Sequence, residues 1–143
     1  MNREETLLRL IMSVHTLTRV ASLETRNETP VAQWRTLALL RDHGPQRVGD
    51  LARLSRVTQP GMTRLAGHMI DAGLLKRSLD PGDARASVLS ITPDGEAALV
   101  DWLDLLSSTV SPHFADLDDA DWAALERVTE ILADKSATLD LPR

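Results

Sequence analysis

Apolar residues recur at helical spacing along most of the chain, in segments separated by polar, glycine- and proline-containing stretches. Positions three and four apart share one face of a helix, so the pattern predicts amphipathic helices. Two of these helices begin with a threonine N-cap followed by proline, at Thr29-Pro30 and at Thr92-Pro93. About six helices are expected: residues 5–24, Pro30 to the Gly44-Pro45 break, 48–55, Thr58 to about Ala72, Pro93 to before Pro112, and one opened by Asp118.

Two short apolar segments after the fourth helix predict strands. They are residues 74–79 and 87–91, and the link between them contains Asp80-Pro81-Gly82-Asp83, a sequence typical of a turn. Two strands joined in this way form an antiparallel hairpin. A short helix, a tight turn, a second helix and a hairpin therefore follow one another within residues 48–91, which is the order of a winged helix-turn-helix. The fold class expected is mainly α, with a two-stranded β-wing.

The charge of the chain is distributed unevenly. Its net charge is −5, which by itself argues against a nucleic-acid partner. Residues 35–85, however, hold nine basic and five acidic residues, whereas residues 94–140 hold two basic and twelve acidic ones. Nucleic-acid affinity depends on the local basic face and not on the total charge. The winged unit is therefore basic where a DNA-binding unit needs to be, and the acidic excess lies in the C-terminal helices.

The second helix of the predicted helix-turn-helix carries the side chains expected in a DNA major groove, which the N-terminal part of a recognition helix enters. Glutamine can pair with adenine and arginine with guanine through two hydrogen bonds, and threonine offers a hydroxyl or a methyl group. A helix N-terminus also favours a phosphate. The expected contacts are Thr58, Gln59, Gly61, Met62, Thr63 and Arg64, with Ser55, Arg56 and Thr58 as candidates for the DNA backbone.

The predicted hairpin adds a second set of DNA-binding candidates. Arg85 lies just past the turn, and an arginine at a wing tip can enter a minor groove, where AT-rich stretches concentrate negative potential. Asp83 repels phosphate, so its expected role is to hold Arg85 or the neighbouring backbone by a charge-assisted hydrogen bond. Lys76 and Arg77 on the first strand add positive charge toward the phosphates.

The helices at both ends of the chain are rich in leucine and tryptophan and carry more apolar surface than the central unit can cover. Such helices suggest mutual burial between two subunits. We therefore divide the chain into an N-terminal dimerisation helix (1–28), a winged helix-turn-helix DNA-binding domain (29–92) and C-terminal dimerisation helices (93–143). The expected partners are a second copy of the chain and a double-stranded DNA operator.

From Thr29 to Leu99 the chain resembles the MarR family of bacterial transcription regulators. The family's wing usually has two arginines after the aspartate, whereas this chain has Ala84 at the first of these positions and keeps the Asp-x-Arg spacing. The matching segments are Asp50-Leu51-Ala52, Gln59-Pro60-Gly61-Met62-Thr63-Arg64-Leu65, Gly73-Leu74-Leu75 with Arg77, Asp83-Ala84-Arg85, and Leu89-Ser90-Ile91-Thr92-Pro93-Asp94-Gly95.

The resemblance implies a homodimer whose terminal helices interlock and whose two winged units bind a pseudo-palindromic operator, in most members as a repressor. It implies more loosely that a small aromatic or phenolic acid relieves repression, bound between the dimer helices and the DNA-binding unit. A pocket of this kind would be lined by His15, Arg19, Trp34 and Trp102. His15 and Arg19 would be the natural anchors for a carboxylate.

Other classes of function find little support. The chain has no cysteine, which excludes disulfides, thiolate metal sites and the thiol-based peroxide sensing of one branch of that family. The four histidines are scattered, and His113 with the acidic residues after it is more simply a solvated helix start than a metal site. Catalytic, nucleotide-binding, secretory and membrane-spanning patterns are not found, so we expect a cytoplasmic protein that is not an enzyme and has no cofactor.

Two alternatives stay open. One is a winged-helix adaptor that uses the same surface to bind a protein, against which the basic excess of residues 35–85 argues. The other is an enzyme, for which a set of catalytic residues would first have to be found.

Overall fold

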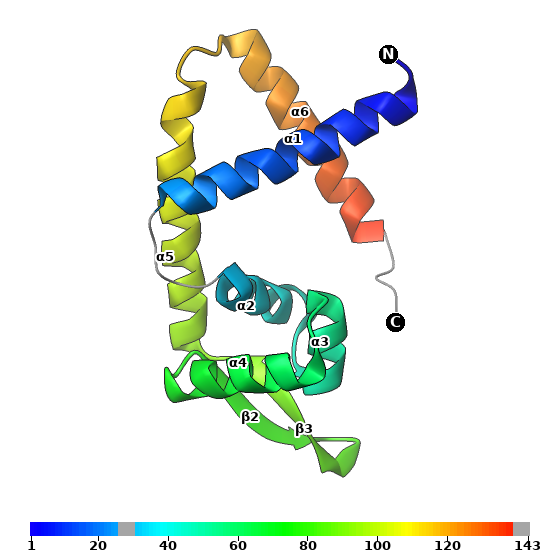
Figure 1. Ribbon diagram of the computed structural model, residues 1–143, viewed down its shortest axis with the longest axis vertical. Helices are drawn as coiled ribbons and strands as arrows, with labels where there is room; N and C mark the ends of the chain where they lie inside the picture. The colour runs from blue at the N-terminus through cyan, green and yellow to red at the C-terminus, as the bar shows by residue number, and fades with distance from the viewer. Residues whose placement is uncertain (26–30, 139–143) are drawn as a thin grey trace.

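The computed structural model describes residues 1–25 and 31–138 and is mainly helical, with one small sheet (Figure 1). The predicted fold class is confirmed: within the described residues, six α-helices and a hairpin follow in the expected order. The helices are α1 (Arg3–Glu24), α2 (Val31–His43), α3 (Val48–Ser55), α4 (Gln59–Asp71), α5 (Pro93–Val110) and α6 (Asp119–Thr138), with a 3-10 turn η1 (Ser111–Phe114) before α6. The strands are β1 (Gln46–Arg47), β2 (Leu75–Asp80) and β3 (Asp83–Ile91).

One hydrophobic core holds the lower half of the molecule together, where α2, α3, α4, the sheet and the start of α5 meet (Figure 1). Leu51 of α3, Met62 of α4, Leu89 of β3 and Leu99 of α5 are fully buried in it. Each comes from the apolar face that helical or strand spacing predicts. The core orients α4 against α3 and the sheet, and thereby decides which side of α4 faces solvent.

The sheet differs from the two-stranded hairpin that the sequence predicted. It has three antiparallel strands in the order β1-β3-β2, with β3 in the centre. The second strand of the hairpin begins at Asp83 instead of Ser87, because two residues, Pro81 and Gly82, suffice for the turn. The carboxylate of Asp80 closes this turn by accepting a hydrogen bond from the Gly82 amide at 2.9 Å. The strand register shifts between Leu79 and Asp80.

A close contact joins α5 to the winged unit. Thr92 caps α5 as predicted: its hydroxyl accepts from the Gly95 amide at 3.0 Å and donates to the Gly73 carbonyl at 2.6 Å. Gly73, with φ of +77°, ends α4 in the left-handed region that favours glycine. Gly95 packs so tightly on Leu74 that a Cβ at this position would lie 2.2 Å from the Leu74 carbonyl oxygen. The start of α5 is therefore held directly against the α4–β2 connection.

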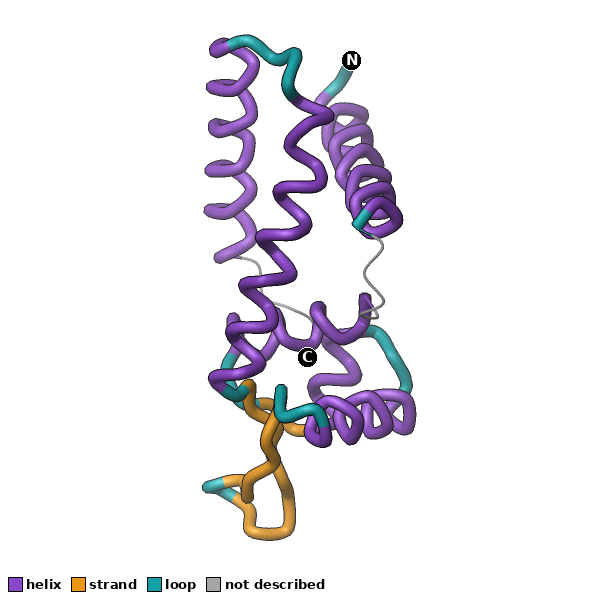
Figure 2. Tube along the Cα trace, turned by 90° about the vertical axis from the view of Figure 1, so that its left-hand side faces the viewer, coloured by secondary structure: helices purple, strands orange, loops and turns teal. Residues whose placement is uncertain are grey.

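The two terminal helices project from this unit. α5 runs up from the core, and α1 and α6 lie on opposite sides of it (Figure 2). α1 begins with a capping box between Asn2 and Glu5, two residues earlier than predicted. At α6, the Asp118 carboxylate accepts from the Asp121 amide at 2.8 Å, as its sequence predicts. None of the helices in the described part of the chain combines the length and apolar character needed to span a bilayer. The predicted Thr29-Pro30 cap lies outside the described residues.

The tight contact at Gly95 leads to a stability prediction. Gly95→Ala should lower the free energy of unfolding by about 1–3 kcal/mol or more, since a methyl group here overlaps backbone that cannot move away cheaply. Gly67→Ala is the matched control: it lies inside α4 with no described neighbour within 4 Å of a Cβ, and should stabilise by about 0.5–1 kcal/mol. Urea unfolding at one fixed protein concentration measures both, and equal effects of the two substitutions would contradict the packing argument.

Candidate nucleic-acid interface

The start of α4 is built around Thr58. This residue has extended backbone angles, φ −68° and ψ 151°, and its hydroxyl accepts from the Gly61 amide at 3.1 Å, which makes it the predicted N-cap. Pro60 lies in the first turn, where its missing N–H has no intrahelical acceptor to lose. A Cβ on Gly61 would lie 2.9 Å from the Thr58 hydroxyl oxygen, so glycine suits the cap itself.

The first turns of α4 divide into an outer and an inner face. Gln59, Thr63 and Arg64 are exposed, as a recognition helix requires. Met62 was among the predicted DNA contacts, but its side chain is fully buried and packs in the core. The reason is helical spacing, because Met62 shares its face with the buried Ala66, four residues later. The thioether of Met62 therefore cannot reach DNA in this structure.

The turn before α4 also corrects one prediction. Ser55 was expected to contact the DNA backbone, but it is buried, and its hydroxyl has no hydrogen-bond partner among the described residues. It lies four residues after the buried Leu51 and thus on the inner face of α3. Arg56 follows in the left-handed region, with φ 56° and ψ 41°, and its side chain is exposed at the corner between α3 and α4. Such a conformation is costly for a residue with a Cβ.

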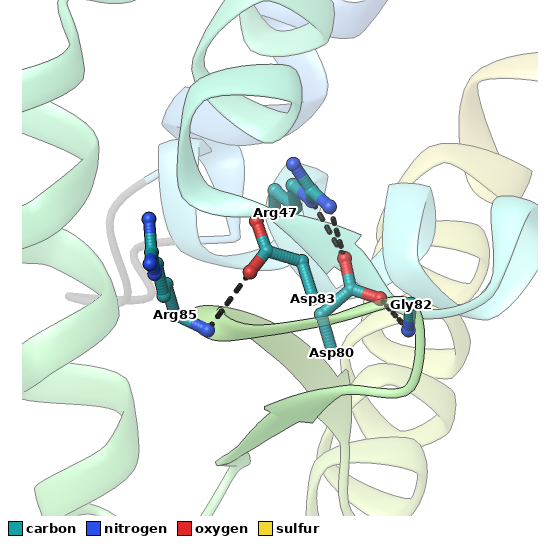
Figure 3. Close-up of polar contacts among 5 residues, drawn as sticks. All are labelled: Arg47, Asp80, Gly82, Asp83 and Arg85. Carbon is teal, nitrogen blue, oxygen red and sulfur yellow. Dashed lines mark hydrogen bonds and ion pairs between the residues drawn. The ribbon is translucent and has the colours of Figure 1, made fainter.

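The wing carries further exposed basic residues. Arg77 lines a cleft of about 460 Å³ between α4 and the wing, together with Gln59 and Thr63. Lys76, one residue earlier on β2, faces the other side of the sheet because successive residues in a strand alternate. The Asp83 carboxylate accepts from the backbone amide of Arg85 at 2.9 Å, which leaves the exposed Arg85 side chain extended from β3 (Figure 3). Asp83 thus holds neighbouring backbone, one of its two predicted roles.

One pair at this surface was missed by sequence reasoning. Arg47 donates to Asp80 through Nε at 2.7 Å and through Nη2 at 2.5 Å (Figure 3). The Gly82 amide and the Arg47 guanidinium lower the pKa of Asp80 below its usual value, and the Asp80 carboxylate raises the pKa of Arg47. The two residues are 33 positions apart, and a two-residue strand such as β1 has no recognisable sequence pattern. Only the strand order β1-β3-β2 brings them together.

The predicted ligand residues are brought together only in part. The rings of Trp34 on α2 and Trp102 on α5 lie 6.1 Å apart, centroid to centroid. Both indole Nε1 atoms are buried without a hydrogen-bond partner in the part of the chain that the structure describes. Buried N–H donors are costly when they lack an acceptor. His15 and Arg19 lie on α1 with exposed side chains, and their place in a pocket stays a prediction.

Comparison with known proteins agrees with this geometry. A family model described as MarR family matches residues 29–86, which run from before α2 to the wing. The HTH-type transcriptional repressor NicR of Pseudomonas putida is 36% identical over 67 residues. That match spans 47% of this chain and 42% of NicR, so the chain spans less than half of this relative.

Solved structures extend the similarity of fold to nearly the whole chain. A MarR family protein from Bacillus stearothermophilus has a TM-score of 0.73 at 17% identity, over 96% of this chain and 100% of that one. BpsR of Bordetella bronchiseptica, whose DNA binding is regulated by 6-hydroxynicotinic acid, has a TM-score of 0.56 at 22% identity, over 92% and 99%. The matched motifs, the winged fold and these relatives lead to one conclusion: the winged unit of this chain is similar to that of the MarR family.

Proposed function

We propose that this protein is a homodimeric DNA-binding transcription regulator, acting as a repressor on a pseudo-palindromic operator. The observation that carries the proposal is the exposed face of α4, on which Gln59, Thr63 and Arg64 stand beside the wing that bears Arg77 and Arg85. Each subunit would place α4 in a major groove and Arg85 in the adjacent minor groove, with half-sites about one helical turn apart. Similarity to the repressor NicR supports repression as the direction of control.

Arg56 and Gln59 should contribute to DNA binding in different ways. Arg56→Gly should weaken binding to all duplexes and reduce the slope of log K against log[salt] by about one, because one phosphate contact is lost. It should not lower the free energy of unfolding, since glycine tolerates the left-handed backbone of this position. Gln59→Ala should instead relax base preference, by about 1–3 kcal/mol at one position, with little change in salt slope.

Selection from a random duplex library, followed by salt titration of the selected site, measures both effects. Thermal unfolding of the two variants serves as the control for folding. Indistinguishable base preferences and salt slopes for the two variants would refute the division between a base contact and a phosphate contact. Absence of salt-dependent binding by the wild-type protein would favour an adaptor that binds another protein.

The exposed surface supports homodimerisation. The chain exposes 10462 Å². A compact monomer of 15.7 kDa would expose about 7,300 Å². Much of the excess is apolar: Leu7 and Ile11 of α1 are 57% and 63% exposed, and α6 buries none of its described residues. Most of the stability of a helix in a protein comes from tertiary packing of its apolar face, so a second copy of the chain is the natural cover for α1 and α6.

A charge on the apolar face of α6 should therefore prevent dimerisation. Ile131→Glu is expected to convert the dimer to monomer or to raise its dissociation constant at least about 100-fold, because it would bury an unpaired carboxylate. Ala133→Glu adds the same charge two positions away, on the opposite side of the helix, and should leave the dimer intact. Light scattering across a range of concentrations measures the mass, and a dimeric Ile131→Glu protein would remove α6 from the proposed interface.

We further propose that a small aromatic acid controls DNA binding, as 6-hydroxynicotinic acid does in BpsR. The support from this chain is the Trp34–Trp102 pair, with two buried indole donors that lack acceptors among the described residues.

In the Trp122→Phe protein these two tryptophans are the remaining tryptophan fluorophores. We expect 6-hydroxynicotinic acid to quench their fluorescence and to release DNA, and Arg19→Ala to weaken both effects if Arg19 anchors the carboxylate. Unchanged fluorescence and DNA affinity with 6-hydroxynicotinic and benzoic acids would argue against such control.

A further inference from the structure

The Arg47–Asp80 pair spans the whole width of the wing sheet. Arg47 lies on β1 and Asp80 on β2, and β3 runs between them. Arg47 is paired with Val88, which is itself paired with Ser78, so these three side chains share one face of the sheet. Asp80 lies two residues beyond Ser78 toward the tip, and its hydrogen bond with Arg47 places its carboxylate on the same face. The Arg47 side chain therefore crosses the central strand to reach the turn of the hairpin (Figure 3).

The two carboxylate oxygens of Asp80 have separate partners. Oδ1 accepts from the Gly82 amide and closes the turn, whereas Oδ2 accepts from Nε and Nη2 of Arg47. The pair acts at the point where the strand register shifts, between Leu79 and Asp80. A register shift bends and twists a hairpin locally, so the direction of the tip depends on what holds it there. Arg47 is also the residue directly before α3, at the start of the helix-turn-helix.

We propose that Arg47 and Asp80 tie the tip of the wing to the base of α3 and so set the distance between Arg85 and Gln59. This inference rests on the proposed DNA-binding function. Arg47 and Asp80 act as positioning residues: they hold two DNA-contacting elements at the spacing of adjacent grooves. The tie works before DNA is bound, because both partners belong to the same subunit and are already paired.

Substitutions that change the charge of the pair distinguish a positioning role from simple electrostatic attraction to DNA. Removing the negative charge of Asp80 should strengthen binding if only electrostatics matter, because the wing then repels phosphate less. It should weaken specific binding if the tie positions the wing. Asp80→Asn keeps an oxygen that can accept from the Gly82 amide, so the turn can still close. The double variant Arg47→Gln/Asp80→Asn has the net charge of the wild type and lacks the ion pair.

The first measurement is affinity for a duplex that the wild-type protein selects from random sequence, compared with sonicated genomic DNA. We expect the double variant to bind the selected duplex about two- to fivefold more weakly, the scale of one exposed ion pair, with unchanged binding to genomic DNA. The single variant Arg47→Lys should retain most of the wild-type affinity, because it keeps a cation opposite Asp80. Asp50→Asn is the matched control: it also removes a carboxylate from an ion pair, but the Arg53 partner lies on the same helix. It should not weaken binding.

The second measurement needs no DNA. The chain has no cysteine, so spin labels can be placed at Ala84→Cys on the wing and His68→Cys on α4 without removing native thiols. With doubly labelled chains diluted into an excess of unlabelled protein, so that a dimer carries one labelled subunit, we expect one narrow distance distribution in the otherwise native chain. It should become broader or shifted when Arg47→Gln/Asp80→Asn is added. An unchanged distance distribution would contradict the proposed tie between Arg47 and Asp80. Wild-type affinity of the double variant for the selected duplex would contradict it too. If the wild type binds no duplex, the proposed function fails, while the spin-label distances still decide the inference.

Discussion

The arrangement of this protein depends on the close approach of α5 to the α4–β2 connection. Gly95 leaves room for the Leu74 carbonyl, and Thr92 bonds both to its own helix and to Gly73 at the end of α4. The same helix that is anchored there continues out of the winged unit to η1 and α6. A rigid junction at this point means that any change in how two copies pack would also move α4 and the wing. Under the proposed function, control of DNA binding through α1 and α6 would require this contact.

The surface divides into two regions with different physical tasks. In the winged unit basic residues outnumber acidic ones, and most of the apolar side chains are gathered into one core from α2 to α5. In α1 and α6 the apolar side chains remain exposed, and the acidic excess lies on the C-terminal helices. If the protein binds DNA as proposed, the acidic C-terminal helices would be repelled by the phosphates. The apolar faces of α1 and α6 favour contact with a second copy of the chain. The net charge of −5 is therefore the sum of a basic winged unit and acidic C-terminal helices.

Within the winged unit, burial decides which candidate residues can meet DNA. Solvent-exposed side chains on α4 belong to Gln59, Thr63 and Arg64. The side chain of Met62 is instead buried in the core. Ser55 is excluded for the same reason, since it follows Leu51 by one helical turn. Both corrections were accessible from the spacing of apolar residues, because Ser55 and Met62 each share a face with a residue whose burial the sequence predicts. The earlier start of β3 was harder to foresee, since polar residues at an exposed wing tip carry no apolar alternation.

The sequence by itself determined the order of elements, the inner faces of the helices, the caps at Thr58 and Thr92, and the segregation of charge. These are local properties, set by spacing, capping chemistry and the position of proline and glycine. Only the tertiary structure decided that β1 joins the sheet, that Arg47 crosses β3 to Asp80, and that Trp34 meets Trp102. Contacts of this kind join residues far apart in the chain, and they exist because the core brings whole elements together in three dimensions. No pattern within a single segment encodes which distant side chain will lie opposite.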